Sequence, residues 1–346
     1  MDLYFMGADF AQKAVLDVFK SLIWTKRYYT CGDFELYTPA TAEITSILAT
    51  SPYVCRDDDD SVMIVENVKI TTDAENGDYY TVTGRSLESI LARRIVQGTD
   101  THQFVIDTDD AANVVYQLLR VNIGEDAEAA RQVSNFDIDD TFSYAADIKM
   151  QITGKNLMQA ITDICTTYGF GFKTTVDSGD IVFSLYAGST TDVTFSAEFD
   201  NLINSDYDYN SENYKNVAYI AGEGEGTARK WAAVGDDTYS GLARRELFVD
   251  ARDISSNGGE ISTSDYDDML MTRGSEKLAD CQTVKAFSGE VEPQTTYRYK
   301  TDYNLGDIVT VDNGYGVTAT PRIIEIIECW DENGYKVVPT FEKWEA

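Results

Sequence analysis

Short β-type runs separated by turn residues are the feature that most restricts the fold of this chain. Aromatic and β-branched residues gather in brief stretches, and Gly7, Gly32 and Pro39 interrupt them. The stretches before Pro39 are Leu3–Met6, Val15–Phe19, Leu22–Trp24, Tyr28–Tyr29 and Phe34–Tyr37. The 22 Tyr and 15 Phe of the chain fit the same preference for strands. The sequence therefore predicts a mainly β fold.

A hairpin is predicted immediately after this region. Residues 62–71 and 79–83 have strand-type composition, and Asn76-Gly77 between them can take the positive φ angles of a tight reversal. Ser86 then precedes an apolar pattern at helical spacing over residues 87–91. We predict a short helix there with Ser86 as its N-cap.

The middle of the chain changes character. Two stripes at helical spacing predict helices, and each is followed by a glycine that can end it. The predicted elements are a helix around Val114–Leu119 ended by Gly124, an acidic loop over 124–141, a helix over Leu157–Tyr168 ended by Gly169, and strands Phe170–Val176 and Ile181–Tyr186. This helix-and-hairpin pattern predicts a small α+β insertion.

Strand signals return near Val193 and are interrupted by a predicted helix around Asp265–Ala279. The end of the chain repeats the order of parts seen at its start. Gly32-Asp33 begins a strand and a later strand reaches a Glu-Asn-Gly turn, and Gly306-Asp307 does the same before Asn333-Gly334. We predict two related β-modules with an inserted α+β unit, bounded as 1–100, 101–200 and 201–346, with strands that the two modules can share.

Charge restricts the ligands of this chain. With 28 Lys and Arg against 59 Asp and Glu, its formal net charge is −31. A surface this acidic repels phosphate, so specific binding of nucleic acid is excluded. No apolar stretch approaches the roughly 18 residues that a spanning helix needs, so no membrane residence is predicted. The five cysteines, Cys31, Cys55, Cys165, Cys281 and Cys329, are widely spaced and are expected to be reduced thiols made in a cytoplasm.

Three segments are candidate sites, and each has a simpler interpretation. The Gly222–Gly226 run carries two carboxylates where a phosphate cradle needs amides, so we predict a mobile loop. Asp57–Asp60 and Asp206–Asn210 suggest calcium, but the second has Ser211 and Val217 where an EF-hand needs Gly and Glu. Solvated acidic loops are the default interpretation of both, and a calcium site of another kind stays open.

Catalysis has little support in the sequence. Any nucleophile–histidine scheme must use His102, the one histidine, which lies on a Thr-His-Gln stretch without a nucleophile elbow. Carboxylate pairs are too numerous to interpret. We predict no enzyme, no cofactor, and no catalytic, cofactor-binding or metal-binding residue. The many tyrosines are compatible with a sugar-binding face or with subunit interfaces.

The most specific strings of the chain are Ile23–Tyr29, Gly32–Leu36, Gly84–Leu87, Ile90–Ile95, Phe287–Val291, Tyr303–Val309, Arg322–Ile326 and Val338–Phe341. Together they resemble a family of siphophage tail-tip or baseplate hub proteins. Residues 342–346 depart from the expected ending, which has a glycine after Phe341. The resemblance implies a structural hub with two tail-tube-like β-barrels, smaller inserted domains and three copies in a ring.

The same resemblance implies a place and partners. Three copies with two barrels each would continue a sixfold tube. The implied partners are other copies of the chain, distal-tail or tail-tube rings, a tape-measure protein, and tip or fibre proteins. The protein would be made in the host cytoplasm and reside in the virion tail, where DNA passes through without specific binding. A lumen lined with carboxylates would keep DNA from adhering. The alternatives are a receptor- or carbohydrate-binding tail module and a peptidoglycan-cleaving tail enzyme.

Overall fold

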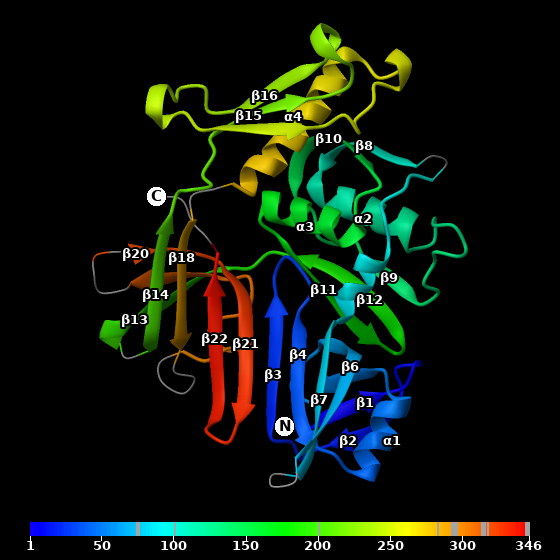
Figure 1. The fold of residues 1–346 in the computed structure, drawn as a ribbon, viewed down its shortest axis with the longest axis vertical. Helices are drawn as coiled ribbons and strands as arrows, with labels where there is room; N and C mark the ends of the chain where they lie inside the picture. Colours follow the sequence, from blue (N-terminus) through cyan, green and yellow to red (C-terminus); the bar gives the residue numbers. More distant parts are fainter. Residues whose placement is uncertain are drawn as a thin grey trace.

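A long antiparallel sheet dominates the structure (Figure 1). The structure, a computed structural model, describes residues 1–73, 77–99, 102–199, 201–281, 284–291, 297–312, 316 and 318–342. The sheet has eleven strands in the order β14-β18-β22-β21-β3-β4-β7-β6-β5-β1-β2. Their bounds are β1 Leu3–Met6, β2 Gln12–Leu16, β3 Ser21–Arg27, β4 Asp33–Pro39, β5 Tyr53–Arg56, β6 Val62–Asp73, β7 Gly77–Ser86, β14 Leu202–Asn210, β18 Val284–Val291, β21 Ile323–Asp331 and β22 Gly334–Phe341.

Two four-stranded units within this sheet have the same strand order. In the second half of the chain the order is β14-β18-β22-β21, and in the first half it is β3-β4-β7-β6. Each unit consists of two antiparallel strand pairs, β14–β18 with β21–β22 and β3–β4 with β6–β7. The last strand of one unit, β21, pairs with the first strand of the other, β3. The sheet therefore contains one arrangement twice.

The first half closes around its own core. Strands β1 to β7 and helix α1 (Ala42–Thr50) contribute to one buried cluster that includes Leu3, Trp24, Leu36 and Val54. The indole of Trp24 on β3 donates to Ser61 Oγ, next to the start of β6, at 3.1 Å. Since β3 and β6 are not neighbours in the strand order, this contact shows that the sheet curls round.

The second half has an equivalent core. A small sheet packs over β21 and β22, and it consists of β13 (Thr190–Ser196), β19 (Ile308–Asp312) and β20 (Thr318–Ala319). Phe195, Val309, Val311, Ile326 and Phe341 meet between the two layers. The predicted fold class, mainly β with an α+β insertion, is confirmed.

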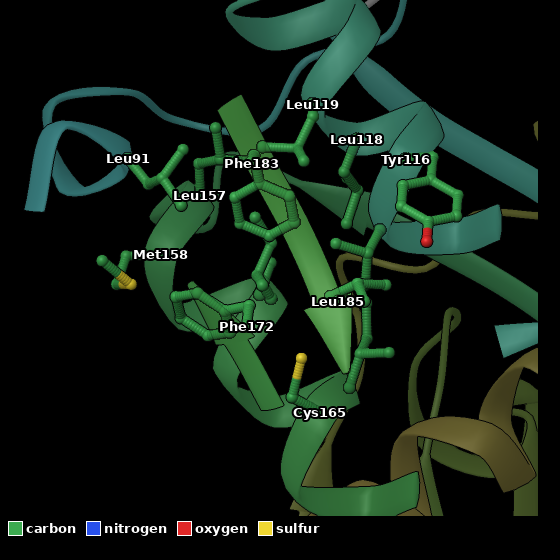
Figure 2. Close-up of a cluster of buried hydrophobic side chains, with 14 of the residues drawn as sticks. Leu91, Tyr116, Leu118, Leu119, Leu157, Met158, Cys165, Phe172, Phe183 and Leu185 are labelled. Atoms are coloured by element: carbon green, nitrogen blue, oxygen red, sulfur yellow. The ribbon is translucent and has the colours of Figure 1, made fainter. Parts of the chain in front are cut away.

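A first inserted unit lies between the halves in sequence. Its core joins two helices to a three-stranded sheet, and Figure 2 shows Leu118, Leu157, Phe172 and Phe183 meeting there. The elements are 3-10 helix η1 Leu87–Arg93, β8 Gln103–Asp110, α2 Ala111–Asn122, β9 Phe136–Asp139, β10 Ala145–Thr153, α3 Leu157–Tyr168, β11 Gly171–Asp177 and β12 Asp180–Tyr186. Gly169 ends α3 with a φ of 74°, as predicted.

A second inserted unit separates β14 from β18. It contains β15 (Val217–Ala221), β16 (Trp231–Gly235), β17 (Glu246–Asp250) and α4 (Thr263–Ala279). Its own buried cluster includes Ile220, Val249, Tyr266 and Leu270. Residues 217–279 thus form a separate core inside the range 201–346 that was assigned to the second barrel. We keep the three predicted ranges as proposed domain limits, with this unit as an insertion in the third.

Several predictions about single elements were wrong. Helix α1 was missed because Ile44, Thr45 and Ile47 are β-branched. The range 124–141 contains strand β9, which pairs in parallel with β12. Ser86 does not cap η1 with its side chain, because its hydroxyl accepts from Gly32 N at 2.7 Å.

The predicted internal repeat is present, but one of its strands differs from the prediction. The hairpins β6–β7 and β21–β22 occupy equivalent places, as predicted, although Glu75 and Asn76 lie outside the described residues. The strand after Gly306-Asp307, β19, pairs with β13 and β20. The place equivalent to β4 is taken by β18. Among the described helices, none is long and apolar enough to cross a bilayer.

Candidate functional site at the joint between the two halves

In the described part of the chain, one strand pairing joins the two halves. Strands β3 and β21 pair antiparallel, from Leu22 opposite Trp330 to Arg27 opposite Glu325. Arg27 fastens one end of this joint, since its Nε lies 2.6 Å from Glu325 Oε2 and its guanidinium lies 2.5 Å from Asp33 Oδ2. The joint is therefore closed by backbone pairing and by charge.

A buried ion pair between β5 and β21 also connects the two halves. The side chains of Arg56, at the end of β5, and of Glu328, on β21, are 0% and 2% exposed. Two guanidinium nitrogens donate to the two carboxylate oxygens at 2.9 and 3.2 Å, and the Tyr335 hydroxyl donates to the same carboxylate at 2.8 Å. The guanidinium also stacks 4.3 Å from the Trp330 ring centroid and 5.5 Å from that of Trp24.

The acidic run that follows β5 is an ion-pair strap. Asp59 Oδ2 lies 2.7 Å from Lys26 Nζ on β3 and 2.9 Å from Lys300 Nζ in the second half. Burial would raise the pKa of Asp59, but the two lysines lower it below its ordinary value. Asp60 pairs with Lys173 of the first inserted unit at 2.9 Å.

The interpretation of Asp57–Asp60 as a solvated loop is therefore wrong for Asp59, whose side chain is 1% exposed. The strap ties the first half, the second half and the first inserted unit together. Within the described chain, no group of three or more His, Cys, Asp or Glu side chains could hold a metal ion.

Tyr28 is the residue at which the same three parts meet. Its backbone N donates to Ile324 O at 2.9 Å and its carbonyl accepts from Phe172 N at 3.2 Å. Its buried hydroxyl accepts from Gly188 N at 3.2 Å. A Cβ on Gly306 would lie 2.4 Å from its ring, so glycine is required at this close approach.

A cavity of about 480 Å³ opens beside the strap. Lys26, Asp59, Lys173 and Lys300 contribute to its wall, and most of these charges are already paired there. Glu88 is a buried member of the wall and accepts from Thr174 N at 2.7 Å. Burial raises the pKa of Glu88. The cavity lies where the first half, the second half and the first inserted unit meet, and its wall carries ion pairs between them.

The other segments singled out from the sequence lie away from this joint. His102 is exposed just before β8. The Gly222–Gly226 loop is fixed by hydrogen bonds within the chain. Glu223 N donates to the Tyr266 hydroxyl at 2.8 Å, and Arg229 Nε donates to Gly222 O at 3.1 Å. Asp206–Asn210 belongs to strand β14 and not to a loop. None of the five cysteines forms a disulfide, and burial raises the pKa of Cys165.

Sequence reasoning missed the residues that make the joint. Arg56 stands directly before four aspartates, and that adjacency was the one available signal for an ion-pair cluster. Glu328 and Tyr28 carried no such signal, since their partners lie far away in the chain. The joint holds the two halves and the first inserted unit together through backbone pairing and ion pairs.

Comparison with known proteins agrees with this fold. The sequence profile of the siphovirus ReqiPepy6 Gp37-like protein family matches residues 3–341. The chain belongs to this family. The resemblance to siphophage tail proteins predicted from the sequence is thereby confirmed. No curated protein sequence matches the chain significantly.

Solved structures of tail proteins share the fold of this Gp37-like chain. The tail protein of Neisseria meningitidis MC58 is similar with a TM-score of 0.59 and 11% identity, over 99% of this chain and 96% of that one. The 43 kDa tail protein of prophage MuSo2 from Shewanella oneidensis gives 0.58 and 13%, over 99% and 98%. The prophage tail protein gp18 from Listeria monocytogenes EGD-e gives 0.57 and 11%, over 100% and 96%.

Proposed function

We propose that this chain is a structural hub of a phage tail tip or baseplate, and that three copies form a ring that continues a sixfold tail tube. The observation that carries the proposal is the repeated strand order of the main sheet. Each chain contributes two four-stranded units in one order, so three chains contribute six. A threefold ring can then present six similar surfaces to a sixfold neighbour.

The joint inside the chain suggests the joint between copies. Strands β21 and β6 are the last strands of their units, and β14 and β3 are the first. Inside the chain, last pairs with first as β21 with β3. A contact that repeats this joint pairs β6 of one copy with β14 of the next. Such a head-to-tail contact closes into a ring when the rotation per copy allows it.

Both strands have an edge free for this pairing in the described part of the chain. Strand β5 covers β6 only along Val62–Ile64. Residues 66–72 of β6 are exposed, including Val68 at 42% and Ile70 at 53%. Strand β14 is the terminal strand of the sheet, and β18 is the one strand beside it. Unpaired edges of this length are templates for another strand.

The face of the sheet that points away from the two cores would line the passage. One cross-strand row on this face runs through six strands and both halves. It consists of Lys336, Cys329, Ile23, Glu35, Thr83 and Asn67. With one carboxylate and one ammonium group, this row does not carry the acidic excess of the chain. We therefore propose a mixed polar wall here in place of a carboxylate-lined one, along which DNA passes without specific binding.

The role requires partners above and below the ring. We infer that distal-tail or tail-tube rings stack on one side, tip or fibre proteins bind on the other, and a tape-measure protein reaches the ring before DNA does. The chain would be made in the host cytoplasm and reside in the virion tail. Assembly, passage and symmetry matching need no catalytic group.

A pair of proline variants tests the proposed joint. Neighbouring residues of an antiparallel strand direct their N–H groups to opposite sides, so one of Val68 and Lys69 faces β7 and the other faces the free edge. Proline removes that donor. We expect V68P and K69P to behave differently. The variant whose N–H faces β7 should lower the melting temperature. The variant whose N–H faces the free edge should keep the melting temperature and abolish three-copy rings in mass photometry. Q12P on the β2 edge is the control, which should still assemble. Rings formed by both β6 variants would refute the β6–β14 pairing.

A further inference from the structure

The second inserted unit presents an exposed aromatic face on the side of its sheet opposite α4. Trp231 on β16 is 53% exposed and Phe248 on β17 is 58% exposed. Tyr219 on β15 lies directly beside Phe248 in the strand register, and Ala221 lies beside Trp231. We call Tyr219, Trp231 and Phe248 the aromatic face. The other side of the same sheet is filled by the buried contact with α4.

Two arginine side chains contact the rings of the aromatic face. The Arg229 guanidinium lies 5.7 Å from the Trp231 ring centroid and 5.9 Å from that of Phe248, and it donates to Ala221 O at 2.9 Å. It also pairs with Asp250 at 2.8 Å. Arg244 donates to the Tyr219 hydroxyl at 2.8 Å. An exposed Trp and a half-buried Tyr, each contacted by an Arg, are residue types that dominate binding at protein interfaces.

The charge around this face differs from the rest of the molecule. Residues 229–252 contain five Arg or Lys and four Asp or Glu, whereas the whole chain has a net charge of −31. Two copies of so acidic a protein repel each other over most of their surfaces. The aromatic face is one place where a second copy can approach without meeting a concentration of carboxylates.

The position of the unit points to the same partner. It is inserted between β14, the edge strand of the proposed joint, and β18. In Figure 1, β15 and β16 lie at the top of the molecule, β14 lies below them on the left, and α2 and β9 lie on the right. A ring that joins the β14 side of one copy to the β6 side of the next brings this unit towards the neighbour's α2–β9 region. That region bears exposed carboxylates at Glu125, Asp126, Glu128, Asp137, Asp139 and Asp140, which we call the acidic surface.

We propose that the aromatic face docks on the acidic surface of the neighbouring copy in the ring. This inference rests on the proposed function, since it requires a ring with a β6–β14 joint. Arg229 and Arg244, which already pair with Asp250 and Glu246 of their own chain, then lie beside the neighbour's carboxylates, and the rings are removed from water. The contact would add a second, side-chain joint above the strand pairing.

A photo-crosslinking experiment tests the contact. A benzophenone amino acid replaces Phe248 in the full chain, rings are isolated and irradiated, and the linked peptides are sequenced. We expect links to residues 125–140 of another copy. Links within one copy, links to a different tail protein, or retention of host polysaccharide by this face would each overturn the inference.

A double variant adds an independent readout. W231A with F248A should leave the melting temperature of the chain nearly unchanged, because both side chains are more than half exposed. It should weaken association of copies at least about tenfold. V18A removes an equally exposed apolar side chain, 65% exposed on the first half, and should have no effect. Normal rings from the double variant would overturn this inference and leave the proposed hub intact, whereas an unaltered chain that never forms rings would overturn both.

Discussion

Arg56 shows how single residues hold the halves together. Its buried guanidinium contacts the buried Glu328, the half-exposed Asp58 and two indole rings. Removing one partner of a buried ion pair leaves the other charge without compensation, which is costlier than losing a surface pair. The strength of the joint is therefore concentrated in a few side chains.

We predict that R56A lowers the free energy of unfolding by about 3–5 kcal/mol, because Glu328 stays buried without its cation. Urea denaturation followed by tryptophan fluorescence measures this, since Trp24 and Trp330 contact Arg56. K173A breaks the exposed pair with Asp60 and should cost less than about 1 kcal/mol. Equal losses for the two variants would contradict the assigned importance of the buried pair.

The lowered pKa of Asp59 predicts that the stability of the folded chain decreases at acidic pH. Its pKa is lowered in the folded state by Lys26 and Lys300, so its contribution to stability is present above the unfolded pKa, about 3.9. That contribution is lost as the pH falls from there through the lower folded pKa. Melting temperatures between pH 7 and pH 3 should fall less steeply for D59N than for the unaltered chain. Parallel curves would show that the strap does not act through this carboxylate.

Elements were predictable where their signals were local. The helix α3 ended at Gly169 and the hairpin β11–β12 followed, because a stripe of apolar residues and a left-handed glycine are sequence-local features. Helix α1 was missed because its β-branched residues imitate a strand, and the pairing of β3 with β21 was missed because its partners, such as Arg27 and Glu325, are far apart in sequence. The joint itself was therefore out of reach of local patterns.

Two glycines with positive φ should respond differently to alanine. Gly169 ends α3 at φ 74° with no backbone within 4 Å of a Cβ, so G169A should cost about 1–2 kcal/mol from backbone strain alone. Gly306, at φ 95°, would place its Cβ 2.4 Å from the Tyr28 ring. We expect G306A to be the more destabilising variant in a denaturant titration, because it also displaces Tyr28. The reverse order would argue against the Tyr28 contact as a close-packed junction.

At the scale of the whole molecule, the sheet contains one four-stranded unit twice. The two units are joined by the β21–β3 pairing, and we propose that the remaining edges, β6 and β14, pair between copies. The resemblance predicted two tube-like modules, and the structure shows their strands in one order, β14-β18-β22-β21 and β3-β4-β7-β6. Composition could not show which edges are free, because edge exposure depends on where β5 stops covering β6. The inserted units contribute no strand to this repeat, and the first of them contacts it through Tyr28 and the Asp60–Lys173 pair.

The most direct measurement is a cryo-electron microscopy map of the assembled tail at a resolution that separates strands. We predict three copies around the axis, with β6 of each copy paired antiparallel to β14 of the next, so that 24 strands form a closed wall. A different number of copies, or β6 and β14 edges that face solvent in the assembled particle, would contradict the account.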